Sequence, residues 1–297
     1  MAPRRANPQR YFALALLAPA LMSALGLIVY PMYLVLAMSF REGKGVNFLD
    51  LSRQPVGLGS YAQVLSDPAT WQSAYVTALY TGGSVAPAFL IGLATALLLN
   101  EQFRGRRWLR GLMLLPWAVP GVLVSILFLW LLDPSYGVVN YLLRSLGLIR
   151  VDVAWLSSEE TALFSVILAT IWKSFPFFTL TLLAALQSIP LTLYEAARMD
   201  GASRAKEFRF VTWPGIQVPA VLALVLNGLW AFREFDIIFA TTGGGPARAT
   251  ETLGIRAYIE AFSYFEMARA SVLGVLMLAI ALLLVLAARR PLRHEFF

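Results

Sequence analysis

The sequence predicts an all-α protein that crosses a membrane six times, and two observations carry this prediction. Hydrophobic residues fill 59% of the 297 positions and charged residues only 14%, with a mean hydropathy of +0.68. An ordinary soluble domain carries about 25% charged residues. The chain also contains six long apolar runs, each near the roughly 20 residues that a helix needs to cross a bilayer. We place the spans at about 11–39, 74–100, 109–132, 161–186, 216–241 and 268–288.

The spans define a transmembrane domain, 11–288, between a short N-terminal tail, 1–10, and a C-terminal tail, 289–297. The first apolar run is too long for the core of a signal peptide and lacks a clear cleavage site, so we expect it to be retained.

Lysine and arginine residues are distributed unevenly between the two sides. Fourteen of the 24 lie in the tails, the second connection and the loop 188–215, and eight are spread over the longer connections on the other side. Basic residues favour the cytoplasmic side. We therefore expect both termini and Arg204 in the cytoplasm, and Lys44, Arg150 and Ala247 outside.

The third span contains two prolines four residues apart, Pro116 and Pro120, followed by Gly121. Proline removes a helical hydrogen bond and clashes with the preceding turn. This spacing predicts a bend inside the span.

The central loop, 188–215, reads as a folded hairpin rather than a tether. Pro190 suits a first helical turn, and the residues that follow are good helix formers. Gly201 permits a turn that a residue with a Cβ resists, and Ser203 is a plausible N-cap for a second short helix. We expect that second helix to end before Pro214.

Glu195-Ala196-Ala197, followed by Gly201 and an apolar pair ending in Pro214, resembles the EAA motif of the membrane subunits of binding-protein-dependent ABC importers. Val211 and Trp213 depart from the usual residues but stay bulky and apolar. In that family the hairpin is the coupling helix that docks into an ATPase subunit. The resemblance implies contacts with the ATPase for Glu195, Ala196, Ala197, Asp200, Gly201 and Pro214.

Polar residues within span five fall on two helical faces. Asn227, Trp230 and Glu234 share one face at spacings of three and four residues, which is typical of a polar translocation path. Arg233 and Asp236 lie on another face, where they could form a structural intramembrane pair. The alternative is that the charged residues reach the outer headgroups.

Span four carries a similar stripe that includes Lys173, Ser174 and Phe177. Aromatic rings beside hydroxyl and amine groups suit a sugar, which offers apolar ring faces and hydroxyls. The alternative for Lys173 is that its stem merely extends to water.

Phe235-Asp236 and the turn Thr242–Pro246 are similar to the end of span five in sugar-importing permeases of the maltose and glycerol-phosphate type, which have a MetI-like fold. That resemblance implies a type I ABC importer permease fold. It also implies solute contacts at Lys173, Ser174, Asn227 and Glu234, with Trp230 on the same face. The implied solute is a sugar, or alternatively a sugar-like solute such as glycerol phosphate.

The resemblance implies a homologous second permease, two ABC ATPase subunits and an extracytoplasmic solute-binding protein as partners. The chain has no phosphate-binding P-loop, so ATP and Mg²⁺ would bind to the ATPase subunits and no cofactor to this chain. With one histidine and no cysteine it lacks an evident catalytic constellation, and we expect no enzyme. The basic residues flank apolar runs, which indicates an inner membrane bilayer rather than nucleic acid. The remaining alternative is a self-contained secondary transporter, which usually has inverted repeats and deep carboxylates that we do not find.

Overall fold

Helices account for the long apolar runs of the chain. The computed structural model describes residues 8–43, 49 and 52–292. Five of its helices are long and apolar enough to cross a membrane, or six when one sharply bent pair counts as a single span. The described residues contain no strand, only an isolated bridge between Arg41 and Val56. The all-α, polytopic fold class is confirmed.

The chain divides into two compact units, Met1–Asp67 with Ala257–Leu276 and Pro68–Arg256 with Met277–Phe297. The first unit contains the first apolar run, which forms α1 (Pro8–Ala24), the π-helical turn η1 (Leu25–Val29) and α2 (Tyr30–Ser39). It also contains α4 (Gly59–Ser66), η3 (Ile259–Ser263) and the start of α15 (Met267–Leu292).

An ion-pair cluster ties the first unit together around Arg269. Its guanidinium lies 2.9 Å from Asp67 Oδ2, 3.4 Å from Glu260 Oε1 and 3.4 Å from Glu266 Oε2. Glu260 is buried, so these contacts compensate for its desolvation.

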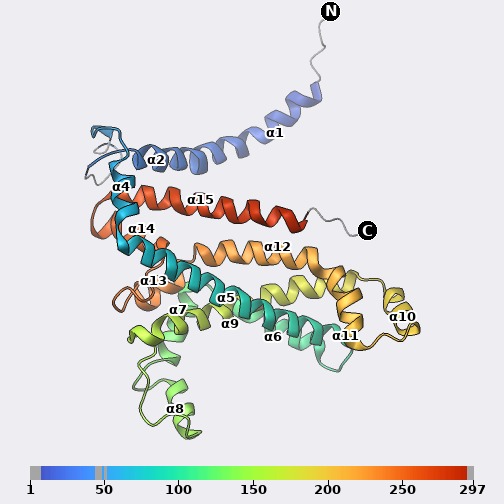
Figure 1. Ribbon diagram of the computed structural model, residues 1–297. Helices are drawn as coiled ribbons and strands as arrows, with labels where there is room; N and C mark the ends of the chain where they lie inside the picture. The colour runs from blue at the N-terminus through green and yellow to red at the C-terminus, as the bar shows by residue number, and fades with distance from the viewer. Residues whose placement is uncertain (1–7, 44–48, 50–51, 293–297) are drawn as a thin grey trace, which may run out of the picture. The chain divides into compact units, whose positions relative to one another are not determined.

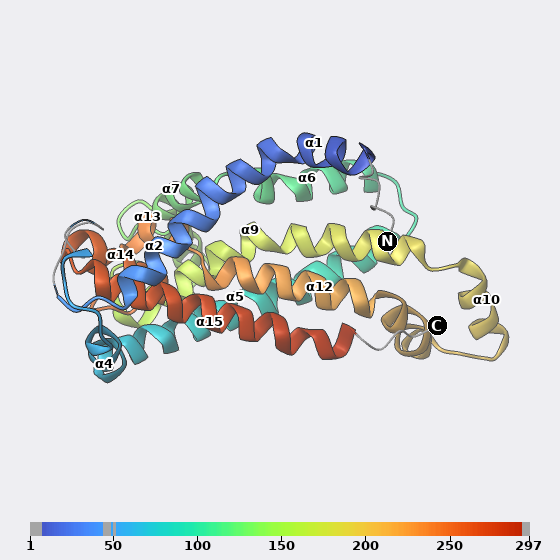
Figure 2. The ribbon, with the colours of Figure 1, turned by 90° about the horizontal axis from the view of Figure 1, so that it is seen from above.

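The core of the second unit is formed by α5 (Pro68–Asn100), α9 (Glu159–Ser188) and α12 (Trp213–Phe232), which pack side by side (Figures 1 and 2). Small residues allow close approach at this core. A Cβ on Gly92 of α5 would lie 2.4 Å from the Phe178 Cβ of α9 and 3.0 Å from the Phe175 carbonyl oxygen. Small residues at helix interfaces are a common means of packing helices within membranes.

Hydroxyl groups also join α5 to α9. The Tyr80 hydroxyl lies 2.6 Å from Thr170 Oγ1, and Thr95 Oγ1 lies 2.6 Å from Thr179 Oγ1. Because lipid offers no hydrogen-bond partners, polar groups inside a span are best satisfied by neighbouring helices.

The third apolar run is divided at the two prolines. Helix α6 (Arg106–Ala118) and helix α7 (Gly121–Leu131) meet at an angle of 96°. The predicted bend is therefore confirmed. After α7 the chain forms a short helix, α8 (Val138–Ser145), before it enters α9.

The fifth span differs from the continuous helix that we predicted. Helix α12 ends at Phe232, and a second helix, α13 (Asp236–Thr242), begins after an interruption at Arg233–Phe235. A six-residue helix, α14 (Leu253–Tyr258), follows the next turn. The interruption moves the charged residues off a regular helix, so helical spacing no longer decides which of them meet.

The loop before α12 forms the expected hairpin, with α10 (Leu191–Met199) and α11 (Arg204–Glu207). It lies at the end of the second unit opposite α13 (Figures 1 and 2). The second helix ends at Glu207, before Pro214 as predicted, but the chain stays helical beyond that end. A π-helical turn, η2 (Phe208–Thr212), joins α11 to α12, and Pro214 lies in the first turn of α12. Proline is tolerated there because the wider π-turn precedes it.

Candidate functional site

The five residues that we predicted for the solute path line one cavity of about 70 Å³ in the second unit. Four come from α9 or α12 at helical spacing, and Glu234 comes from the interruption after α12. The lining is Trp117, Thr170, Lys173, Ser174, Asn227, Trp230, Ala231, Glu234 and Ile237. The cavity therefore brings together the polar faces of spans four and five.

Lys173 supports the bend of the third span. Its ammonium donates a hydrogen bond of 2.8 Å to the carbonyl oxygen of Val119, the residue that follows α6. The last carbonyls of a helix have no partner within the helix and carry negative partial charge. Lys173 thus stabilises the exposed end of α6, and its stem lines the cavity.

Glu234 stabilises the N-terminal end of a helix in the fifth span, whereas Lys173 stabilises a C-terminal end. Its Oε1 accepts a hydrogen bond of 3.2 Å from the backbone N–H of Ile237, in the first turn of α13. The first N–H groups of a helix lack partners and favour a negative charge. The two ionisable residues of the cavity therefore each stabilise the end of a broken helix.

Asn227 is a buried polar residue of the cavity for which the described residues provide no hydrogen-bond partner. Its side chain is 5% exposed, and across the described part of the chain its amide makes no hydrogen bond. The amide is not among the fully enclosed polar atoms that lack a partner, so it is open to a ligand or water in the cavity. Beside it, Trp230 packs edge-on against Phe177 with ring centroids 4.9 Å apart.

Sequence reasoning missed Trp117 as a lining residue. It lies in α6 between the two prolines of the bend, so the Pro116–Gly121 motif could have indicated that Trp117 lines the cavity. Thr170 and Ser174 also reach the cavity, where the Ser174 hydroxyl donates to the Thr170 carbonyl oxygen at 2.7 Å.

The expected pair between Arg233 and Asp236 does not form. Both residues are exposed, and the described residues contain no ion pair between them. The prediction assumed one continuous helix, but Arg233 caps the end of α12 and Asp236 begins α13. Arg233 instead lines a separate, mainly apolar cavity with residues of α12 and α15, outside the one that contains Asn227.

The turn of the hairpin at Gly201 follows a Schellman motif. The Ala202 N–H donates to the Ala197 carbonyl at 2.9 Å, and the Gly201 N–H donates to the Arg198 carbonyl at 3.0 Å. Gly201 has a φ of +73°, in the left-handed region that this motif requires. The space around its Cα is open. Conformation rather than crowding therefore favours glycine here.

Two contacts close the hairpin. Arg198 forms a two-point ion pair with Glu207, with Nε–Oε1 at 2.8 Å and Nη2–Oε2 at 3.4 Å. The Tyr194 hydroxyl lies 3.1 Å from Thr212 Oγ1.

The motif residues keep one side of the hairpin open. Glu195, Ala196 and Asp200 are exposed, and Pro214 and Ala197 are half-buried. Beside the turn, the apolar side chain of Met199 is 88% exposed. The hairpin thus presents carboxylates and an apolar tip.

At the other end of the second unit, the turn after α13 is held by Glu251. Its buried carboxylate accepts a hydrogen bond of 3.0 Å from the Ser73 hydroxyl of α5. It also forms ion pairs with Arg248 Nε at 2.9 Å and with Arg256 Nη1 at 3.1 Å. The Leu253 N–H donates to Thr77 Oγ1 of α5 at 2.9 Å. These contacts hold the turn after α13 in place against α5. In the sequence this turn was recognisable only by the glycines of the segment Thr242–Pro246.

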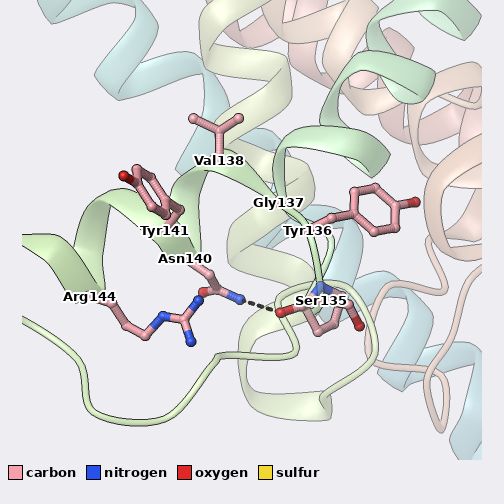
Figure 3. A pocket seen from close by; sticks show the side chains of 8 residues that line it. Ser135, Tyr136, Gly137, Val138, Asn140, Tyr141 and Arg144 are labelled. Atoms are coloured by element: carbon pink, nitrogen blue, oxygen red, sulfur yellow. Dashed lines mark hydrogen bonds between the residues drawn. The ribbon is translucent and has the colours of Figure 1, made fainter.

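A second pocket, of about 190 Å³, lies around α8 (Figure 3). Its central polar residue is fully engaged. The Asn140 amide donates to the carbonyls of Pro134 and Val153 and accepts from the Val153 N–H and the Trp155 indole. Tyr136 and Tyr141 point in different directions, so the pocket lacks converging free polar groups.

Comparison with known proteins decides the family. The family described as the binding-protein-dependent transport system inner membrane component matches residues 88–290, more than half of the chain. The chain belongs to this family. It is a multi-pass permease of a binding-protein-dependent importer, as the hairpin motif indicated.

Curated relatives match most of this permease. The trehalose/maltose transport system permease MalF of Thermococcus litoralis is 41% identical over 212 residues, which cover 71% of this chain and 70% of the relative. The sulfoquinovosyl glycerol permease SmoG of Agrobacterium fabrum is 34% identical, covering 96% and 92%. YcjO of Escherichia coli, an inner membrane ABC transporter permease, is 34% identical, covering 94% and 93%.

Solved structures share the fold. A chain of a bacterial ABC transporter for import of the acidic polysaccharide alginate aligns with a TM-score of 0.84 at 24% identity, covering 98% of each chain. A chain of the alginate transporter in complex with an alginate pentasaccharide-bound periplasmic protein gives 0.82 at 25% identity, covering 96% of each. The type I ABC importer permease fold is thereby confirmed.

Proposed function

We propose that this permease forms half of the translocation path for a sugar or a sugar-like solute. The observation that carries the proposal is the convergence of Lys173, Ser174, Asn227, Trp230 and Glu234 on one cavity. Trp230 offers an aromatic face, and Asn227 offers both a donor and an acceptor. This combination suits a solute with apolar ring faces and hydroxyl edges. Sugar permeases among the relatives support the same solute class.

The lining of the cavity supports a path that two subunits share. This chain contributes residues of α6, α9, α12 and the segment up to Ile237, which form one wall of such a path. A homologous second permease would supply the other wall. An extracytoplasmic binding protein would deliver the solute, as the periplasmic protein in the alginate complex suggests.

The hairpin of α10 and α11 is our candidate for coupling to ATP hydrolysis. In this proposal two separate ABC ATPase subunits bind ATP and Mg²⁺, and each permease inserts one hairpin into an ATPase cleft. Glu195, Asp200 and the exposed Met199 side chain would make the contacts, with Ala196 and Ala197 allowing close approach. Gly201 holds the turn, and Pro214 lies in the first turn of α12, just after the π-helical turn η2.

We infer that the hairpin and both termini face the cytoplasm. The basic residues of the hairpin and of the connection before α6 support this orientation. The α13 end of the second unit, with Glu251, would then face the outside and meet the binding protein.

Co-purification tests the proposal. The tagged permease, purified from its native membrane, should retain a second permease and an ATPase. In proteoliposomes, the loaded binding protein should stimulate ATP hydrolysis. Stable, proton-coupled transport by this chain alone would instead identify a secondary transporter and reject the proposal.

A further inference from the structure

We infer that the cavity of this permease selects a neutral, polyhydroxylated solute and disfavours anionic ones such as sugar phosphates, uronates or sulfonates. The inference rests on the proposed function and specifies the substrate class. It comes from the charged groups of the cavity and from what the protein itself already uses them for.

Lys173 is the only cationic side chain among the residues that line this cavity. Its ammonium is held 2.8 Å from the Val119 carbonyl, at the negative end of α6. An anionic solute would share the ammonium with that helix end, which uses one of its three donors. Arg233, which is close in sequence to the cavity residues, lines a different cavity.

Glu234 is the one carboxylate of the lining, and it balances the charge of Lys173. It accepts hydrogen bonds from the backbone N–H groups of Ile237 and Asp236 in the first turn of α13. A carboxylate can accept up to about four hydrogen bonds, so it has capacity for donors from a solute. A hydroxyl provides such a donor. A phosphate, carboxylate or sulfonate has no proton to donate at neutral pH and is repelled.

Asn227 completes the recognition of hydroxyl groups. Its buried amide, without a partner in the described residues, offers one acceptor oxygen and two N–H donors. A hydroxyl group both donates and accepts, so it matches the amide and the carboxylate together. An anion facing this wall, which carries no excess positive charge among its described residues, would lose hydration there without compensation from the wall.

Transport of solute pairs that share a sugar skeleton and differ in charge tests the inference. The complete transporter, in proteoliposomes with its binding protein, is offered trehalose against trehalose 6-phosphate and glucose against glucuronate. We expect ATP-driven uptake of a neutral member at least about tenfold faster than that of its anionic partner, the scale of one unmatched polar contact. Uptake of an anionic member at an equal or higher rate overturns the inference and leaves the proposed function intact. ATP-driven uptake of a solute that is not a sugar, with no uptake of either member of any pair, removes the proposed sugar function and the inference with it.

A second measurement concerns Lys173, because its role in the inference is to position the bend. Lys173→Met should lower the maximal uptake rate of the neutral solute and the thermal stability together, with the half-saturating concentration changed by less than about twofold. Lys173→Arg, which keeps a donor, should restore both. Arg233→Met is the matched control, since it removes a cation that lies outside the cavity. A large rise in the half-saturating concentration at unchanged stability would mean that Lys173 binds the solute, which overturns the inference.

Discussion

At the scale of single residues, the cavity depends on groups whose partners lie far away in the sequence. Lys173 meets Val119, 54 positions earlier, and Glu234 meets the first turn of the next helix. Each charge stabilises a helix end that the bilayer could not solvate. The same residues that we predicted as solute contacts therefore also maintain the shape of the path.

Asn227 and Glu234 give the sharpest prediction at this scale. Asn227→Ala and Glu234→Ala should each reduce solute uptake by about 5- to 150-fold, because a hydroxyl left without its partner costs about 1–3 kcal/mol. Uptake into proteoliposomes measures the effect. Assembly with the ATPase and basal ATP hydrolysis should persist in both variants.

Gln217→Ala is the matched control for Asn227, since it removes an amide from the same helix outside the cavity. It should transport normally. Undiminished uptake of all candidate solutes by the Asn227/Glu234 double variant would show that the path runs elsewhere.

At the scale of elements, the close contact of α5 with α9 sets the frame on which the cavity is built. Gly92→Ala would place a Cβ 2.4 Å from the Phe178 Cβ, so the helices must separate. We expect a loss of about 1–3 kcal/mol in the free energy of unfolding, as for other overpacked cores. Thermal unfolding of the purified protein in detergent measures it.

Gly82 provides the control on the same helix, because nothing lies within 4 Å of a Cβ placed there. Gly82→Ala should leave the melting temperature unchanged or raise it slightly. Equal melting temperatures for the two variants would contradict the assigned packing of α5 against α9.

The hairpin is the second element with a distinct prediction. Gly201→Val should impair ATPase coupling, because a β-branched residue resists the φ of +73° that the turn requires. Gly201→Asn should be milder, since asparagine tolerates this conformation. Glu195→Lys should weaken the hairpin's contact with the ATPase without altering the turn.

Binding-protein-stimulated ATP hydrolysis by the reconstituted complex measures these hairpin variants. Stimulation at the wild-type level in both Gly201→Val and Glu195→Lys would rule out this hairpin as the coupling element.

At the scale of the whole molecule, orientation is the property to test. The chain has no cysteine, so single cysteines can be introduced without background. Cysteines at Arg150 and Ala247, both exposed positions, should react with an impermeant reagent added outside intact cells. A cysteine at Arg204 should react only after the membrane is opened.

The position of Lys44 lies outside the described residues, but labelling there should follow Arg150. Reaction of the Arg204 position from outside would reverse the proposed topology and place the hairpin where no ATPase could reach it.

The sequence by itself determined the helical class, the bend at Pro116–Gly121 and the hairpin turn at Gly201, and it indicated the lining residues that lie on regular helices: Lys173, Ser174, Asn227 and Trp230. These features depend on hydrophobic runs, on backbone restrictions of proline and glycine, and on helical spacing, which are all local. Only the tertiary structure decided that Lys173 supports α6, that Glu234 caps α13 and that Arg233 and Asp236 remain apart. These partners depend on where helices break and on which broken ends meet, and both are set by packing between segments distant in the sequence.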